Sequence, residues 1–250
     1  IQALRHALPE LQEEKMAYAG RLDPMAEGIL LVLLREACKE RDKYLGCDKE
    51  YQFEVLLGLG SDTHDVLGLV HSGDAHKIAQ GTESELSKEI QEALDTLQGA
   101  QEFAYPAYSS KTVEGKPLFL WALEGRLEEI QIPTREVEIY DINLCELYWT
   151  RLSEILGQID ERISKVRKVT DASKALGADF RREAVLDSWH TLAKTLPADT
   201  PLVVARIQAQ VSSGTYMRTL AQVLGAKLGT QALAWRIKRT KLGEYVALSE

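Results

Sequence analysis

The chain has 250 residues, of which 45% are hydrophobic and 27% are charged, and its formal net charge is −8. These values are typical of an ordinary soluble globular protein with a substantial core. No apolar run is long enough to span a bilayer and no secretory leader is recognisable, so we expect a cytoplasmic protein without membrane contact. The three cysteines lack metal-ligand spacing and are odd in number, which argues against a disulfide framework.

The acidic balance argues against a nucleic-acid partner, because neutralising phosphates usually requires a basic surface. The charges are unevenly distributed, however. Acidic residues crowd 83–102 and 122–141, whereas residues 236–241 are densely basic. A local positive face on an acidic protein is therefore compatible with the sequence, as is the simpler interpretation that these are solvated faces.

Apolar periodicity predicts both helices and strands along the chain. Helical patterns occur at 1–14, 35–45, 83–97, 117–123, 152–166, 180–196 and 214–228. Strand patterns occur at 29–34, 49–59, 69–71, 135–148, 202–211, 232–241 and 245–248. Several strand pairs are expected to be antiparallel, so the fold class is α+β rather than a doubly wound parallel sheet.

Three of these elements carry local detail. Thr82 and Glu85 have the spacing of a capping box at the start of the helix over 83–97. A slip in the alternation of 135–148 predicts a β-bulge. The run 29–34 is wholly apolar, which predicts a strand buried on both faces.

An acidic residue, Asp23, lies between a glycine turn and that apolar run. Pro24 fixes its own backbone and biases Asp23 toward an extended conformation. Gly20 and Gly28 permit close backbone approach on either side. One carboxylate is thus expected on a stiff loop at the mouth of a hydrophobic core, although in isolation an Asp-Pro pair is more simply a turn.

Five sequence blocks give this aspartate a specific context. The first block, at 20–30, has the pattern Gly-x-Leu-Asp-Pro-Met-Ala-x-Gly-x-Leu, and the others lie at 48–55, 60–68, 106–119 and 213–220. The ordered set resembles the motifs of the tRNA pseudouridine synthase B family, whose members isomerise a uridine in the T-arm of tRNA.

The resemblance implies the pseudouridine-synthase fold, a central mixed, mostly antiparallel sheet flanked by helices around a cleft. Residues 1–250 would form a single catalytic domain without the C-terminal RNA-binding domain that the family usually carries. The family usually has a shorter connection at 150–196, so we interpret this segment as a helical insertion. Its basic residues could contact RNA, although a solvated face is the simpler interpretation. They are Lys165, Arg167, Lys168, Arg181 and Arg182.

The implied activity is isomerisation of uridine 55 in the T-arm of tRNA to pseudouridine, and the implied partner is tRNA. The reaction breaks the bond from ribose C1′ to N1, rotates the base and rejoins it through C5, so no cofactor or metal is expected. Asp23 is the candidate nucleophile, because a carboxylate is ionised at neutral pH without activation. Whether it attacks the base or assists departure of the base from the sugar stays open. We expect a monomer.

The resemblance also assigns the other catalytic residues. Arg218 corresponds to the family arginine that pairs with the catalytic aspartate. The helix dipole disfavours arginine at the start of a helix, which suggests a specific anionic partner for it. Tyr51 corresponds to the family tyrosine that stacks on the target base, although a phenol pKa of about 10 makes it a poor base alone.

The candidate substrate-binding residues are Tyr18, Tyr51, Tyr216 and Ile237. Tyr216 and Ile237 occupy positions that line the family's uridine pocket, whereas unaided each would be interpreted as core packing. The target uridine is stacked in a folded loop, so it must be flipped out of the stack. The family holds the opened loop with a histidine five residues before the aspartate. Tyr18 occupies that position here, which keeps an aromatic ring and loses the imidazole.

Two other function classes stay open. A non-catalytic RNA-binding or RNA-folding module on the same fold is favoured slightly by the acidic charge and by Tyr18. It is disfavoured by the retained Asp23, Tyr51 and Arg218, because a pure binder does not need this trio.

A hydrolase would need Asp23 to work with a second carboxylate, such as Asp62 or Asp65. Such chemistry depends on the distance between the two carboxylates, about which the sequence is silent. The histidines have no metal-ligand spacing and are interpreted as surface or core residues. They are His64, His71, His76 and His190.

Overall fold

The computed structural model describes residues 1–166 and 181–246. The α-helices are α1 (Gln2–Ala7), α2 (Arg41–Leu45), α3 (Ala75–Ala79), α4 (Glu83–Asp95), α5 (Leu118–Leu123), α6 (Leu152–Lys165), α7 (Arg182–Thr195) and α8 (Met217–Lys227). The 3₁₀ segments are η1 (Pro9–Leu11), η2 (Arg35–Glu40) and η3 (Leu127–Glu129). None of the helices in the described ranges combines the length and apolar character that crossing a membrane requires.

The strands account for most of the remaining ordered backbone. They are β1 (Met16–Ala19), β2 (Glu27–Gly28), β3 (Leu31–Leu34), β4 (Lys49–Leu57), β5 (Leu59–Ser61), β6 (Val70–Ser72), β7 (Gly99–Ala104), β8 (Thr112–Val113), β9 (Lys116–Pro117), β10 (Thr134–Arg151), β11 (Pro201–Val211), β12 (Ala232–Leu242) and β13 (Tyr245–Val246). Three expectations reach outside the described residues. They are the start of the helix predicted at 180–196, the end of the strand predicted at 245–248, and the possible RNA contacts of Arg167 and Lys168.

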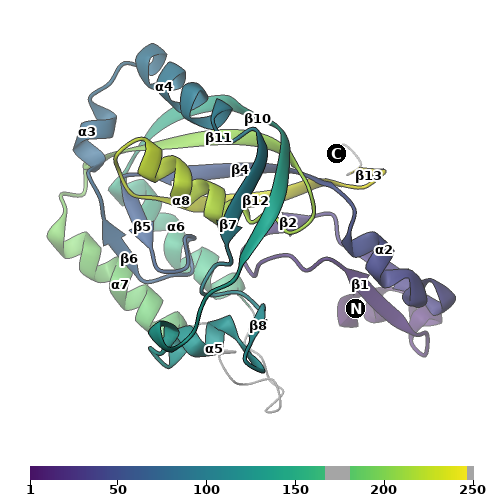
Figure 1. The fold of residues 1–250 in the computed structure, drawn as a ribbon. Coiled ribbons are helices and arrows are strands. Elements are labelled where there is room, and N and C mark those ends of the chain that lie inside the picture. Colours follow the sequence, from purple (N-terminus) through teal and green to yellow (C-terminus); the bar gives the residue numbers. More distant parts are fainter. Residues whose placement is uncertain (167–180, 247–250) are drawn as a thin grey trace.

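A sheet of seven strands forms the centre of the molecule (Figure 1). Its order is β13-β12-β4-β11-β10-β7, and β2 pairs with β12 off this path. The β2–β12 pairing is parallel, and the other pairings in the sheet are antiparallel. The predicted mixed, mostly antiparallel sheet of an α+β fold is therefore confirmed.

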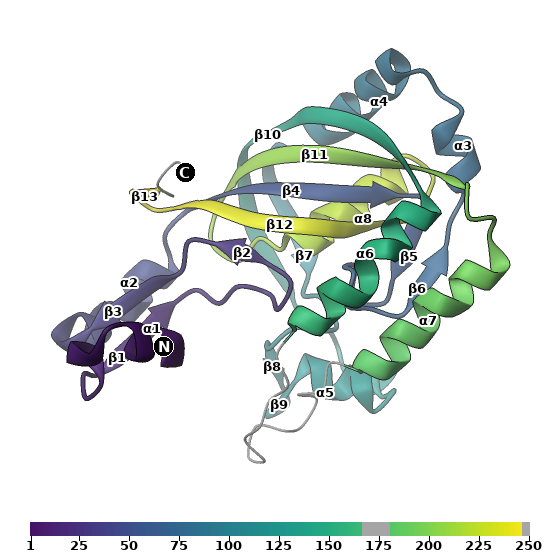
Figure 2. The same ribbon diagram turned by 180° about the vertical axis from the view of Figure 1, so that it is seen from behind.

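Helices cover both faces of this sheet (Figures 1 and 2). α4 and α8 pack on one face, where Val55 and Leu57 of β4 join the larger buried cluster. α6 and α7 pack on the other face, where Leu56 joins a second buried cluster. Since successive strand residues point to opposite faces, a central strand such as β4 supplies both cores.

The local details expected from the sequence are present in two elements. Thr82 Oγ1 accepts a hydrogen bond from the Glu85 backbone at 3.3 Å, and the Glu85 carboxylate accepts one from the Thr82 backbone, which completes the capping box of α4. β10 shifts its register against β11 between Ile139 and Asp141 and again between Leu144 and Glu146, where the bulge was expected.

The N-terminal segment forms a lobe beside the main sheet (Figure 1). β1 and β3 make a two-stranded sheet of their own, flanked by α1 and α2. The prediction that 29–34 is a strand buried on both faces is wrong, because β3 covers only the last four of these residues and Leu33 alone is buried. A two-stranded sheet has no second layer to seal both faces, so an apolar run there stays half-exposed.

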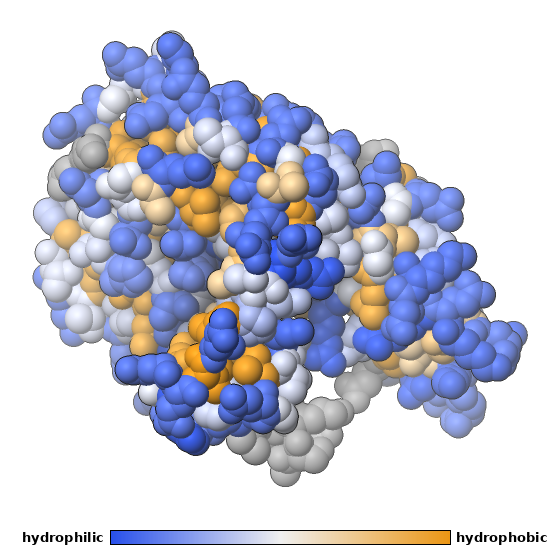
Figure 3. Space-filling view, viewed as in Figure 1, coloured by the Kyte–Doolittle hydropathy of each residue, from blue (hydrophilic) through white to orange (hydrophobic). Residues whose placement is uncertain are grey.

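The surface seen in Figure 3 is largely polar. Apolar residues gather on it over α4 and α8 in the upper half and around α5 at the lower edge, with smaller groups on the lobe at the right. In α5, Leu118 and Trp121 are buried and Leu123 is exposed.

The pair of helices α6 and α7, called the hairpin below, docks on the back of the sheet through large apolar side chains (Figure 2). Trp189 of α7 is fully buried, and its indole Nε1 donates a hydrogen bond to the Val66 carbonyl at 3.3 Å. Arg162 of α6 lies over the Trp235 ring at 3.8 Å and donates to the Trp235 carbonyl at 2.7 Å. These contacts fix the helix pair against β12 and against the loop that follows β5.

We expect Trp189→Ala to lower the free energy of unfolding by about 3–5 kcal/mol, because it leaves a cavity and an unpaired carbonyl between α7 and the sheet. Urea unfolding followed by circular dichroism measures this loss. The matched control is His190→Ala on the exposed side of the same helix, which should change the value by no more than about 0.5 kcal/mol. Equal losses in the two variants would contradict the docking role of Trp189.

Candidate active site

Asp23 lies on the loop that leads from the lobe into the main sheet, between β1 and β2. The Ala26 backbone donates to the Asp23 carbonyl at 2.9 Å, so residues 23–26 form a turn with Pro24 at its second position. Met25 and Ala26 pack against the buried cluster that also contains Phe53 and Ile237. The Asp-Pro pair is thus a turn, as its local sequence suggests, and the turn is anchored on the core.

Arg239 of β12 fixes both flanks of this loop. Its Nε donates to the Ile29 carbonyl at 2.8 Å, and its Nη2 donates to the Gly20 carbonyl at 3.1 Å. Gly28 has a φ of +105°, and a Cβ there would lie 2.2 Å from the Arg239 carbonyl, so only glycine fits. Arg239 is 1% exposed, although the basic run 236–241 suggested a solvated or RNA-facing stretch.

The guanidinium of Arg218 reaches Asp23 from the first turn of α8. Nε donates to Asp23 Oδ2 at 2.8 Å, and Nη2 donates to Asp23 Oδ1 at 3.2 Å. Two carbonyls complete the coordination, those of Thr63 at 3.1 Å and Tyr108 at 3.4 Å. The Arg218 side chain is 4% exposed and that of Asp23 is 29% exposed, so the carboxylate alone of this pair faces outward. Such a bidentate pair is both strong and directional.

A second carboxylate stands behind the pair. Asp65 Oδ2 lies 3.7 Å from Arg218 Nε, and Asp65 Oδ1 accepts from Thr63 Oγ1 at 2.6 Å and from the Leu67 backbone at 2.9 Å. Burial raises the pKa of Asp65 to about 6, against the opposing effect of the Arg218 charge. Burial alone would lower the pKa of Arg218, but the Asp23 and Asp65 carboxylates raise it above its ordinary value.

This geometry bears on the hydrolase alternative. Asp65 does share a guanidinium with Asp23, but it is 3% exposed and cannot meet a substrate or a water from solvent. Asp62 points elsewhere and pairs with Arg181 at 2.7 Å. The sequence singled out Asp65 only as a hydrolase carboxylate, and its Thr-x-Asp spacing is the signal that could have suggested a buried, hydrogen-bonded acid.

Tyr51 and Tyr216 stand within electrostatic reach of Asp23. Burial raises the pKa of Tyr51, the adjacent Arg239 guanidinium opposes this rise, and Asp23 adds to it. Burial likewise raises the pKa of Tyr216, with Arg218 opposing and Asp23 adding. Both phenols are therefore neutral at pH 7 and can donate a hydrogen bond or stack.

Ile237 shares a strand face with this group. In the register of β4 and β12, Tyr51 is opposite Arg239 and Phe53 is opposite Ile237, and residues two apart on a strand point the same way. Ile237 is 3% exposed in the larger buried cluster, on which Tyr51 also packs. The structure thus brings Asp23, Arg218, Tyr51, Tyr216 and Ile237 into one region.

Tyr18 lies outside this group. It belongs to β1 in the lobe, where its ring is 5.7 Å from the Arg21 guanidinium and its carbonyl accepts from Arg41 Nε at 3.2 Å. Among the described residues, no hydrogen bond or ring contact joins Tyr18 to Asp23 or Tyr51. Its place is at the edge of the lobe, five residues along the chain from the carboxylate.

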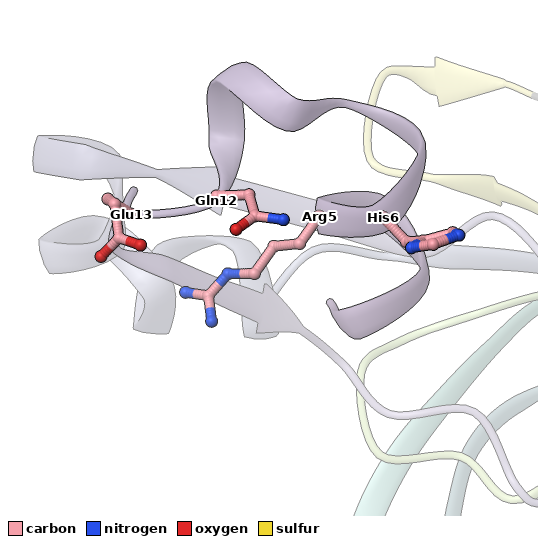
Figure 4. A pocket seen from close by; sticks show the side chains of 4 residues that line it. All are labelled: Arg5, His6, Gln12 and Glu13. Atoms are coloured by element: carbon pink, nitrogen blue, oxygen red, sulfur yellow. The ribbon is translucent and has the colours of Figure 1, made fainter.

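Two hollows are notable. A cavity of about 440 Å³ is lined by Arg5, His6, Gln12 and Glu13 of the N-terminal segment, and contains none of the predicted site residues (Figure 4). A cleft beside Tyr216, lined also by Tyr105 and Arg135, has a free volume of only about 10 Å³, which is about one water position. A nucleotide can enter this cleft only if its walls move apart. Within the described residues, no three His, Cys, Asp or Glu side chains are grouped to hold a metal ion.

Comparisons with known proteins bear on this site. The sequence model of the TruB family pseudouridylate synthases (N-terminal domain) matches residues 9–161. The tRNA pseudouridine synthase B of Oleidesulfovibrio alaskensis is 29% identical over 234 residues, which cover 93% of this chain and 56% of that protein. The tRNA pseudouridine synthase B of Caldanaerobacter subterraneus is 34% identical over 134 residues, which cover 53% of this chain and 44% of that protein. The chain thus spans about half the length of these curated relatives.

A solved structure has the same fold. A chain in the crystal structure of a Cbf5-Nop10-Gar1 complex superposes with a TM-score of 0.51 at 16% identity, over 97% of this chain and 46% of that chain. Together with the family match, this likeness confirms the predicted pseudouridine-synthase fold.

We expect the stability of the wild type, relative to Asp65→Asn, to fall as the pH rises from about 4 to about 6. In this window the unfolded aspartate has lost its proton while the folded one keeps it, so the folded state binds more protons and loses stability with rising pH. From the raised pKa of about 6, the fall is at most about 3 kcal/mol. Urea unfolding of both proteins at pH 4, 5, 6 and 7 gives the difference, and a constant difference would contradict the raised pKa.

We expect Arg239→Met to lower the free energy of unfolding by about 2–4 kcal/mol, because the Ile29 and Gly20 carbonyls lose a charged donor. The loop at 20–29 should also become more sensitive to limited proteolysis. The neighbouring Lys238→Met removes the same charge from an exposed position and should have little effect on either measurement. A loop that stays resistant in Arg239→Met would contradict the clamp.

Proposed function

Because the chain belongs to the TruB family of pseudouridylate synthases, we propose that it isomerises a uridine of tRNA to pseudouridine. The observation that carries the proposal is the pairing of Asp23 with the buried Arg218. Both carboxylate oxygens of Asp23 accept hydrogen bonds from the Arg218 guanidinium, at 2.8 and 3.2 Å. The five sequence blocks extend the proposal to uridine 55 of the T-arm. The names of the curated relatives support a tRNA substrate.

The reaction requires a nucleophile that the protein holds in a fixed position. In the reaction the N1–C1′ bond breaks, the C5–C1′ bond forms, N1 gains a proton and C5 loses one, so the base is conserved in composition. We assign the nucleophile to Asp23, whose oxygens are oriented by Arg218 and whose loop is clamped at both ends by Arg239. A preorganised carboxylate of this kind does not have to be reoriented during the reaction.

The aromatic side chains supply the surroundings of the extruded base. We assign Tyr51 to stacking on the base and to relaying the C5 proton, and Tyr216 and Ile237 to the walls of the uridine pocket. Tyr216 meets Tyr105 edge to face at 6.2 Å and an interplanar angle of 72°, so the wall is itself supported by an aromatic contact. The base must rotate after the N1–C1′ bond breaks and before the C5–C1′ bond forms. Uncharged phenols in an apolar wall can contact it in both orientations.

The lobe offers a second contact for the RNA loop. Tyr18 and the exposed Arg21 lie together on it, and the chain that joins them to Asp23 is short. We assign Tyr18 to stacking in the space that the flipped uridine leaves, with Arg21 available to a phosphate. This assignment fits the position of Tyr18 at the edge of the lobe better than a place in the pocket itself.

We expect Asp23→Asn to reduce pseudouridine formation by more than about a thousandfold while tRNA binding is largely retained. Asparagine keeps one oxygen for Arg218, so the pair survives in geometry and loses the nucleophile. Tritium release from tRNA carrying 5-tritiated uridine measures the reaction, mass-spectrometric mapping locates the product, and a filter-binding assay gives the Kd. The control is Asp160→Asn, an exposed carboxylate on α6.

The outcomes separate the alternatives. Full turnover by Asp23→Asn would remove Asp23 from the mechanism. A wild-type protein that binds tRNA or a T-arm hairpin and forms no pseudouridine would contradict the enzyme and support a non-catalytic RNA-binding module.

A further inference from the structure

Arg181 makes an unusually complete set of contacts for a residue that begins a surface helix. Its Nη1 donates to Asp62 Oδ2 at 2.7 Å and its Nη2 donates to Asp62 Oδ1 at 3.1 Å. Its guanidinium lies 4.4 Å from the centre of the Tyr108 ring, within the range of a cation–π contact. The backbone of Arg181 has a φ of +51°, a region that non-glycine residues occupy only when other contacts hold them there.

The two partners of Arg181 also hold one another. Tyr108 Oη donates to Asp62 Oδ2 at 3.1 Å, and Asp62 Oδ1 accepts from the Leu69 backbone at 2.8 Å. Burial, followed by the Asp62 charge, raises the pKa of Tyr108 to about 12, so its hydroxyl remains a donor throughout the neutral range. We call Arg181, Asp62 and Tyr108 the hairpin lock.

The hairpin lock lies directly behind Arg218. The Thr63 carbonyl, one residue after Asp62, accepts from Arg218 Nη1 at 3.1 Å, and the Tyr108 carbonyl accepts from Arg218 Nη2 at 3.4 Å. The same two chain segments are therefore held on one side by Arg181 and offer carbonyls to Arg218 on the other side. Arg218 and Arg181 thus share the two segments as common partners.

We propose that Arg181 is a positioning residue, through which the α6–α7 hairpin sets the orientation of Arg218 and hence of the Asp23 carboxylate. The kinetic consequence of this proposal rests on the proposed function, whereas the placement of Arg218 does not. The hairpin does not need Arg181 for its own docking, because Trp189 and Arg162 already attach it to the sheet. Both terminal nitrogens of Arg181 are used on Asp62, and its side chain is 21% exposed, so it is poorly placed to serve as a phosphate contact.

The test compares Arg181→Met, Arg181→Lys and Arg182→Met. Arg182 is the matched control, because it carries the same charge at the next position and donates to the Val166 carbonyl at 3.0 Å, within the hairpin. In Arg181→Met we expect the single-turnover rate of pseudouridine formation to fall about tenfold, with the Kd for tRNA changed by no more than about twofold. Arg181→Lys should recover only part of the rate, since an ammonium group cannot bridge both oxygens and stack on a ring.

A spectroscopic measurement makes the test independent of activity. In protein labelled with nitrogen-15 arginine, the Nε–H resonance of Arg218, assigned by its loss in Arg218→Lys, should shift or broaden in Arg181→Met and stay in place in Arg182→Met. Thermal unfolding of each variant shows that rates and spectra are compared among folded proteins. Should the wild type form no pseudouridine, the proposed function fails, and the resonance still decides whether Arg181 positions Arg218.

Three results would overturn the positioning role. An unchanged Arg218 resonance in Arg181→Met means that the lock does not reach the guanidinium. A weaker Kd at an unchanged rate makes Arg181 an RNA contact. Equal losses of rate in Arg181→Met and Arg182→Met make the effect a general property of the hairpin.

Discussion

The structure depends on how a buried arginine is compensated. Arg218 is almost wholly removed from solvent, and a guanidinium in that position is tolerated only if nearly all its donors find acceptors. It finds them in Asp23 and in the carbonyls of Thr63 and Tyr108, and Asp65 adds a second negative charge 3.7 Å from Nε. These residues come from separate parts of the chain, so the requirement of one side chain draws the loops together. In this pair Arg218 is buried, whereas the Asp23 side chain stays 29% exposed. A carboxylate must be accessible in this way before it can react with a substrate.

The sheet provides a rigid support for the loops of the site. β12 carries Ile237 and Arg239 on the face that it shares with Tyr51 of β4, and β2 is attached to its edge by parallel pairing. Arg239 of β12 holds Gly20 and Ile29 at the two ends of the Asp23 loop, which attaches the loop to the sheet. Arg218 of α8 fixes the carboxylate itself, so Asp23 is held from two elements of the fold. Sites built in this way keep their geometry before the substrate arrives.

Periodic patterns predicted the longer helices and most strands of the main sheet, but missed its edge strand β7 and the short strands β1 and β2. The limits of those patterns explain the errors. Alternation located β4, β10, β11 and β12, because each is amphipathic or apolar over many residues. The apolar run at 29–34 was misjudged because hydrophobicity shows that a segment avoids water and does not show how many layers cover it. The basic run at 236–241 misled in the opposite way. In β12 the exposed Arg236 and Lys238 alternate with the buried Ile237 and Arg239, so charge density in the sequence is divided between two faces.

The part of the candidate site that could be predicted is the set of residues that lie in the sequence blocks. The pairing of Asp23 with Arg218 is seen in the structure as the resemblance implied, and Tyr51, Tyr216 and Ile237 lie in the same region. The contributions of Arg239, Asp65 and Arg181 were missed because each acts through a neighbour in space. No spacing in the sequence shows that Arg181 and Arg218 share two loops, since that fact exists only after α7 has docked.

Two of the basic residues of the hairpin serve internal contacts, so its basic character is not by itself a sign of RNA binding. Two of its cations point inward, Arg162 to Trp235 and Arg181 to Asp62, so they add little to the positive potential at the surface. Positive charge that faces outward is also found beside an aromatic ring near the site. The exposed Lys111 lies 5.0 Å from the Tyr105 ring, which in turn contacts Tyr216. An acidic protein can in this way present a local positive face, because screening at physiological salt confines the effect of each charge to about 8 Å.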